Sequence, residues 1–295
     1  MTLDTAQITN IAEWVDSARS DPNEYQRRQV VEITLSAIAI NPDLREHLLL
    51  KGGTLMALAY GSPRFTMDVD FTAVFISPDQ AQHLIDTLND TLPIAARNSG
   101  YLDLECRVQS MEMKPRSGPM SWPTLEVKIG SARRGNNQIA RLNEGLAAHV
   151  TKLEISFNEH VETTQHLTMP NHGHYILAYS IHELIAEKFR ALLQQPIRNR
   201  ARRQDVYDIS RIVKNRAFDD RERSLILKTL ALKAKSRNVP IGPDALSSDE
   251  VKNKARSEYH TLQLEIDDLK LDFDADFGVA ETFYKSLPWD KIEPN

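Results

Sequence analysis

The chain has 295 residues, of which 41% are hydrophobic and 26% charged, a composition typical of a globular protein. Its net charge of -5 argues against a basic surface that binds nucleic acid along its whole length, and its single cysteine, Cys106, excludes an internal disulfide. The first residues carry no secretory signal, and no apolar run approaches the roughly 20 residues that a membrane span needs. We therefore expect a soluble, cytoplasmic protein that does not associate with a membrane.

The first part of the chain, residues 6–50, predicts helices, because apolar residues recur there at three- and four-residue spacing. Next comes KGGTLMALAYGSPRFTMDVDF, residues 51–71, which contains a glycine pair, a short helix, a turn and a strand. In that strand Asp68 and Asp70 alternate with apolar residues, so both carboxylates lie on one face. Two neighbouring anions repel each other unless a cation lies between them. The pattern therefore predicts a cation-binding position.

The middle of the chain mixes helix and strand signals, and the rest is mainly helical. Residues 77–100 predict an amphipathic helix, and residues 135–145 predict a loop. Strands are predicted at 102–113, 124–132 and 151–161. This pattern suggests a mixed α/β domain over residues 1–170, with N-terminal helices, and a helical C-terminal domain over residues 171–295.

A third carboxylate lies in the strand at 151–161, where Glu154 shares one face with Lys152. Glu126 in the preceding strand is an alternative to Glu154, and the sequence does not decide between them. Three carboxylates suit one or two Mg²⁺ ions, or Mn²⁺, which prefer oxygen ligands and act in phosphoryl transfer. The glycine pair would let a phosphate approach the backbone at the start of the following helix.

Two charges in the helical half lie on otherwise apolar helix faces. Lys188 falls on an apolar stripe, and Asp205 and Asp208 share a face with isoleucines. We expect Lys188 and Asp205 to meet across the cleft between the two halves, although a purely structural ion pair stays open. The segment from Lys188 to Arg203 holds six cations and no acid. It is either a solvated basic loop or a site for the backbone of RNA.

Four segments, KGGTLMALAYGSPRFTMDVDF, TKLEISFNE, HELIAEKFRALL and RRQDVYDI, occur in an order that resembles the AbiEii/AbiGii-type nucleotidyltransferase toxins. These belong to the DNA polymerase β-like nucleotidyltransferase superfamily, and the resemblance spans about residues 45–215. It implies an α+β fold, a mixed sheet with flanking helices followed by a helical C-terminal domain. One departure is Gln204, which stands where many members have an arginine before the aspartate.

The resemblance also implies roles for individual residues. The implied catalytic residues are Asp68, Asp70, Lys188 and Asp205. The implied nucleotide-binding residues are Gly52, Gly53, Thr54, Arg64, Thr66 and Lys152. The implied metal ligands are Asp68, Asp70 and Glu154. The basic run suggests Arg198, Arg200, Arg202 and Arg203 for RNA binding.

The activity implied by this resemblance is transfer of a nucleotide from an NTP onto the 3′ end of a tRNA by the toxin of a toxin–antitoxin system. The family's antitoxin is typically a winged-helix regulator. Two other readings stay open: a nucleotidyltransferase that modifies a protein side chain, and an inactive binding module of the same fold. The intact Asp68 and Asp70 and the glycine pair argue against the inactive module.

Overall fold

A nine-stranded mixed sheet forms the centre of the described molecule. The computed structural model describes residues 2–3, 7–8, 10–64, 66, 68–116, 121–135, 137–169, 173–266 and 271–291. The strands are β1 (Thr2–Leu3), β2 (Gln7–Ile8), β3 (Leu48–Lys51), β4 (Asp68–Ala73), β5 (Leu104–Lys114), β6 (Thr124–Arg133), β7 (His149–Ser156), β8 (Thr163–Met169) and β9 (His174–Tyr179). Their order is β1-β8-β9-β3-β4-β7-β6-β5, and β2 also pairs with β8.

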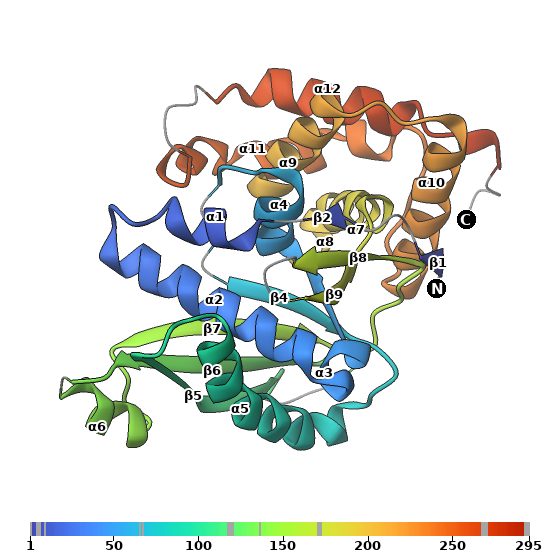
Figure 1. The fold of residues 1–295 in the computed structure, drawn as a ribbon. Helices are drawn as coiled ribbons and strands as arrows, with labels where there is room; N and C mark the ends of the chain where they lie inside the picture. Colours follow the sequence, from blue (N-terminus) through green and yellow to red (C-terminus); the bar gives the residue numbers. More distant parts are fainter. Residues whose placement is uncertain are drawn as a thin grey trace.

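Helices cover the sheet and then build a separate layer. The helices are α1 (Ile11–Asp16), α2 (Pro22–Ile40), α3 (Pro42–His47), α4 (Gly52–Tyr60), α5 (Ala81–Asn98), α6 (Gln138–Asn143), α7 (Ile181–Leu193), α8 (Gln195–Arg198), α9 (Arg203–Asn215), α10 (Asp220–Ser236), α11 (Asp249–Arg256) and α12 (Phe273–Lys285). In Figure 1, α9, α11 and α12 lie at the top, with α4 and α7 between them and the sheet. The fold is α+β, as the sequence predicts.

Capping side chains explain where the N-terminal helices begin. Asp21 accepts hydrogen bonds from the backbone N–H groups of Asn23 and Glu24, and Pro22 occupies the first turn of α2. Asn41 caps α3 in the same way. Helix α3 ends at His47, however, and Leu48–Lys51 forms β3 instead of continuing the predicted helix. The three leucines have no solvent exposure, because β3 lies between β4 and β9 in the middle of the sheet.

Three further local predictions differ from the structure. Helices are predicted from residue 6 onward, but Gln7–Ile8 forms strand β2 and the first helix, α1, begins at Ile11. The predicted loop at 135–145 contains the short helix α6, which packs Leu142 into the interior. Strand β8 has no counterpart among the predicted elements. Its buried threonines and glutamine do not form the apolar alternation by which a strand is recognised.

Strand β9 bears on the division of the chain into domains. It follows residue 170, yet it lies inside the sheet between β8 and β3. Pairing of β3 with both β9 and β4 is what places Lys51 and the glycine pair beside the carboxylates of β4. We therefore propose that the helical region begins after Tyr179 and not at residue 171.

Candidate active site

The register of the sheet brings charged residues from four strands into one row. Lys51 on β3 is opposite Asp70 on β4, Asp70 is opposite Glu154 on β7, and Glu154 is opposite Glu126 on β6. Residues opposite each other on paired strands project from the same face of the sheet. The two alternatives for the third carboxylate, Glu154 and Glu126, are therefore neighbours. Asp68 is one step away on the same face of β4, opposite Lys152.

Lys152 is the cation among these carboxylates. Its ammonium group is bonded to Glu154, lies 3.3 Å from Oε2 of Glu126 and 4.0 Å from Oδ2 of Asp68. Burial lowers the pKa of Lys152, but Glu154, Asp68 and Glu126 together raise that pKa above its usual value. Lys152 is therefore a permanent positive charge that offsets the repulsion between the carboxylates.

Asp70 depends on the absence of a side chain at Gly52. A Cβ atom on Gly52 would lie 2.0 Å from Oδ2 of Asp70, and Gly52 has a φ of +69°. Only glycine fits both constraints without a shift of the aspartate. Burial raises the pKa of Asp70 to about 6; Lys51 lowers it, and the charges of Glu154 and Asp68 raise it. An additional cation beside Asp70 would therefore stabilise the charged form of this carboxylate.

The remaining residues of the glycine turn pack closely around Gly53. A Cβ atom there would lie 2.6 Å from Oγ1 of Thr66 and 3.0 Å from Nη2 of Arg64. The hydroxyl groups of Thr54 and Thr66 both donate to the backbone carbonyl of Asp68, each at 3.3 Å. Thr54 is buried, so its side chain fastens α4 to β4. Because the hydroxyl group of Thr54 is engaged in this way, the predicted contact between Thr54 and a nucleotide would be made by the backbone N–H group of Thr54.

A buried cluster of ions joins α7 and α9. The ammonium group of Lys188 lies 2.9 Å from Oδ1 of Asp205 and 2.7 Å from Oδ2 of Asp208. Burial lowers the pKa of Lys188, but Asp205 and Asp208 raise it above its usual value. Both helices belong to the C-terminal region, so this pair does not cross between the halves as the sequence suggested. Arg64 makes that crossing, with Nη2 3.5 Å from Oδ2 of Asp208.

The described residues of the basic run divide into cations with acidic partners and cations without them. Arg190 is buried and bonded to Glu187, and Arg203 lies 2.8 Å from Oε1 of Glu265. The side chains of Arg198, Arg200 and Arg202 line the cleft, and among the described residues no acidic group is within ion-pair distance of them. Burial and the like charges of Arg190 and Arg202 lower the pKa of Arg198. These three arginines form an anion-attracting wall, which we call the arginine wall.

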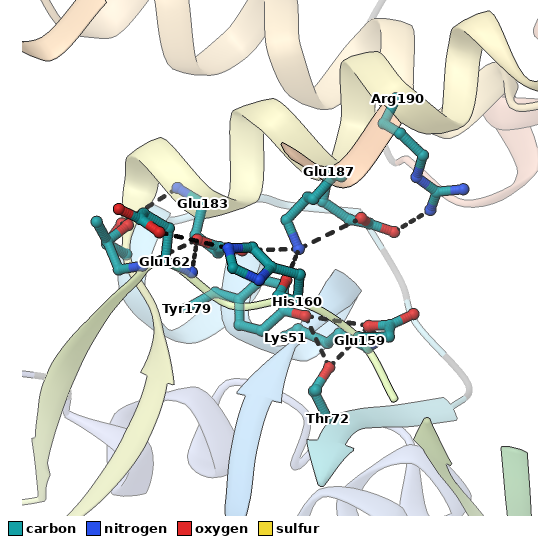
Figure 2. Close-up of polar contacts among 12 residues, drawn as sticks. Lys51, Thr72, Glu159, His160, Glu162, Tyr179, Glu183, Glu187 and Arg190 are labelled. Atoms are coloured by element: carbon teal, nitrogen blue, oxygen red, sulfur yellow. Dashed lines mark hydrogen bonds and ion pairs between the residues drawn. The ribbon is translucent and has the colours of Figure 1, made fainter. Parts of the chain in front are cut away.

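A second buried network, shown in Figure 2, supports the other side of the site. The carboxylate of Glu159 accepts hydrogen bonds from Lys51 at 2.5 Å, Thr72 at 2.9 Å and the hydroxyl of Tyr179 at 3.1 Å. Burial alone would raise the pKa of Glu159, but the charges of Lys51 and Lys233 hold it below its usual value. The network therefore stays charged and fixes Lys51, the residue before Gly52.

Most of these groups border one cleft of about 530 Å³, a volume in the range of small-molecule sites. The basic residues that line it are Lys51, Arg64, Lys188, Arg190, Arg198, Arg200, Arg202 and Arg237. The acidic residues that line it are Asp68, Asp70, Glu154, Glu159, Glu187, Asp205 and Glu265. The cleft also includes Gly52, Gly53 and Thr66, whereas Thr54, Lys152 and Arg203 do not line it.

Several lining residues were not predicted from the sequence. Lys51 directly precedes the glycine pair and Glu187 directly precedes Lys188, so their positions in the sequence could have indicated that they belong to the site. Trp122 and Arg237 stand in segments with no recognisable pattern, and Glu159 ends the segment TKLEISFNE but was not singled out in it. They reach the cleft because β6 begins beside it and β7 and α10 end beside it.

The donor set fits a divalent cation. Asp68, Asp70 and Glu154 offer the carboxylate oxygens that Mg²⁺ and Mn²⁺ prefer, and the missing Cβ of Gly52 lets the Asp70 carboxylate lie directly against the glycine turn. In the described ranges, no group of three His, Cys, Asp or Glu side chains is already gathered as a metal site. Lys152 instead engages Glu154, so these side chains would rotate to ligate an ion.

The chain resembles known proteins over most of its length. The family model described as the nucleotidyl transferase AbiEii toxin of type IV toxin–antitoxin systems matches residues 33–279. A search of curated proteins found no match. Among solved structures, JHP933 from Helicobacter pylori is 13% identical, with a TM-score of 0.48, covering 89% of this chain and 90% of that one. MenT4, a nucleotidyltransferase toxin from Mycobacterium tuberculosis, is 15% identical, with a TM-score of 0.42, covering 94% and 99%.

Proposed function

Since this chain belongs to the AbiEii family of nucleotidyl transferase toxins, we propose that it transfers a nucleoside monophosphate from an NTP to the 3′ end of an RNA, with tRNA as the acceptor. In this reaction the acceptor hydroxyl oxygen forms a bond to the α-phosphorus, pyrophosphate leaves, and the hydroxyl proton is released. The observation that carries the proposal is the row of Asp70 and Glu154, with Asp68 beside it, facing the cleft next to the Gly52–Gly53 turn.

The chain's own residues divide this task. The backbone N–H groups at the start of α4 would hold the triphosphate, where Gly52 and Gly53 allow close approach. Lys188, kept charged by its two aspartates, would attract a phosphate oxygen from the opposite wall. Asp68, Asp70 and Glu154 would hold Mg²⁺ or Mn²⁺. When bound, the ion would offset charge on the phosphates and polarise the phosphoryl oxygens.

The arginine wall supports RNA as the acceptor. Arg198, Arg200 and Arg202 are cations without acidic partners among the described residues, in a protein whose net charge is -5. A polyanion would relieve their mutual repulsion and release counterions from its own phosphates. A small triphosphate at the glycine turn would not require an additional wall of three arginines. An RNA strand with several phosphates would use it.

The family also implies a partner and a setting. A toxin of a toxin–antitoxin system has an antitoxin, and we propose a winged-helix regulator in that role. We place the reaction in the cytoplasm, where tRNA and NTPs are available. Across the described residues, no helix combines the length and apolar character needed to cross a membrane.

The direct test is transfer of label. The protein is incubated with each radiolabelled NTP in turn, with Mg²⁺ and total tRNA, and the products are separated on a denaturing gel. Label in tRNA that requires the intact Asp70 supports the proposal. Label in a protein band instead of RNA would replace it with side-chain modification. No label with any NTP, from protein that is folded by thermal melting, would point to an inactive module.

A further inference from the structure

Trp122 and Arg237 form a stacked pair at the wall of the cleft. The guanidinium carbon of Arg237 lies 3.8 Å from the centroid of the Trp122 ring, and both residues line the cleft. The only other aromatic residue among the described lining is Tyr179, which is fully buried, with its hydroxyl bonded to Glu159 and 2.7 Å from that of Thr72. Trp122 is half-buried and therefore the aromatic surface that a ligand in the cleft can reach.

The pair is held in place from both sides. On the tryptophan side, the N–H of Phe157 donates to the carbonyl of Pro123 at 2.9 Å, and the amide of Asn158 donates to the carbonyl of Ser121 at 3.2 Å. On the arginine side, Nη2 of Arg237 lies 3.2 Å from Oε1 of Glu159. Glu159 in turn is bonded to Lys51. The stacked pair is therefore fixed relative to the glycine turn, which begins one residue after Lys51.

The pair also lies on the side of the cleft where the positive charge gathers. Burial lowers the pKa of Arg237, Glu159 opposes this, and the nearby charges of Arg190 and Arg198 lower it further. Trp122 precedes β6, four residues before Glu126 in the row of carboxylates. The pair thus lines the same cleft as the arginine wall, and Arg237 lies close enough to Arg198 to feel its charge.

An aromatic face beside unpaired arginines is the combination that binds single-stranded nucleic acid, because bases stack on the ring while cations hold the phosphates. Resting on the proposed function, we propose that Trp122 and Arg237 form a base-stacking platform for one of the last bases at the 3′ end of the acceptor RNA. The platform fixes how far the strand enters, and thereby places the terminal hydroxyl at the carboxylates. The platform would bind any of the four bases without sequence preference, since every base has a face that can stack on an aromatic ring.

Trp122 fluorescence tests this directly. The chain has three tryptophans, so a Trp14→Phe/Trp289→Phe variant reports on Trp122 alone. The probes are a short single-stranded RNA with a free 3′ hydroxyl, the same RNA with abasic ribose at its last two positions, and each NTP with Mg²⁺. We expect quenching by the intact RNA and little by the abasic RNA, which carries the same phosphates. Equal quenching by the two RNAs, quenching by NTP alone, or none would overturn the assignment to an acceptor base.

Substitution supplies the second test, with a matched control in the same chain. Trp122→Ala should bind the intact RNA about tenfold or more weakly, the usual loss for one stacked base, and Trp122→Phe should restore most of the affinity. Trp14 also stacks with an arginine, Arg28, at 4.7 Å, and does not line the cleft, so Trp14→Ala should bind RNA normally. Normal RNA affinity in folded Trp122→Ala would refute the platform. Failure of wild-type protein to label any RNA would instead refute the proposed function.

Discussion

The ammonium group of Lys188 lies 2.7 Å from Oδ2 of Asp208, a side chain with no solvent exposure. The sequence pointed to Asp205 as the partner of Lys188, and the structure adds Asp208 one turn later on the same helix. Arg64 reaches the same carboxylate from the segment before β4. The buried aspartate thus links both walls of the cleft, and this relationship has consequences for stability as well as for catalysis.

Lys188→Met should therefore destabilise the protein in a pH-dependent way. Removing one partner of a buried ion pair commonly costs about 3–5 kcal/mol, because the other charge stays buried alone. Burial alone would raise the pKa of Asp208, but Lys188 and Arg64 hold it below its usual value. A carboxylate with a lowered pKa stabilises the fold above about pH 4 and loses that contribution as the pH falls further.

We expect the unfolding free energies of wild type and Lys188→Met to differ most at neutral pH and to converge below about pH 4. Urea titrations across this range measure the difference. Lys214→Met is the matched control, because Lys214 is half exposed and its pair with Asp276 should be worth only about 0–1 kcal/mol. A difference for Lys188→Met as small as that of the control would contradict the argument.

Gly52→Ala should abolish nucleotidyl transfer. The new Cβ would meet Oδ2 of Asp70 at 2.0 Å, and the backbone conformation at Gly52 adds about 1–2 kcal/mol of strain. Gly61→Ala is the matched control, because its φ of +58° brings similar strain while no atom lies within 4 Å of the new Cβ. We expect similar losses of melting temperature from backbone strain but loss of activity only at position 52. Full activity in Gly52→Ala would remove the turn from the site.

Asp70→Asn should stop transfer and leave the fold intact. Burial disfavours the charged form of Asp70, as its raised pKa shows, so a neutral amide should not lower the melting temperature at neutral pH. Label transfer and thermal melting together measure the two effects. Asp90→Asn, an exposed position on α5, provides the control and should be fully active. Transfer at the wild-type rate in Asp70→Asn at saturating Mg²⁺ would contradict the proposed role of the row of carboxylates.

Replacing Arg198, Arg200 and Arg202 together with alanine should weaken RNA binding and reduce its dependence on salt. Each lost phosphate contact removes nearly one unit from the slope of log affinity against log salt concentration. The control triple variant replaces Arg97, Arg107 and Arg221, which are exposed and do not line the cleft, so net charge changes equally. Identical affinity and slope in the two triple variants would show that the acceptor binds elsewhere.

Local spacing along the chain was enough to predict several features of this protein. Alternation placed Asp68 and Asp70 on one face of a strand, and the helical period placed Lys188 among apolar residues. The glycine pair marked a turn, and four segments in order identified the family. Each of these signals lies within a few residues of chain, so periodicity and residue type are sufficient to read it.

The groups that meet across the cleft could be identified only from the folded chain. Lys51 and Glu159 are 108 residues apart, and Arg64 and Asp208 are 144 apart, so no local period connects them. Strand β3 was mistaken for helix because a strand buried between two others carries leucines without alternation. The register of β4, β7 and β6 placed Lys152 among the carboxylates, and the ends of β6 and α10 brought Trp122 to Arg237. Such contacts follow from strand pairing and helix packing. Residues throughout the core contribute to the free energy of that packing, so no single segment of the sequence predicts these contacts.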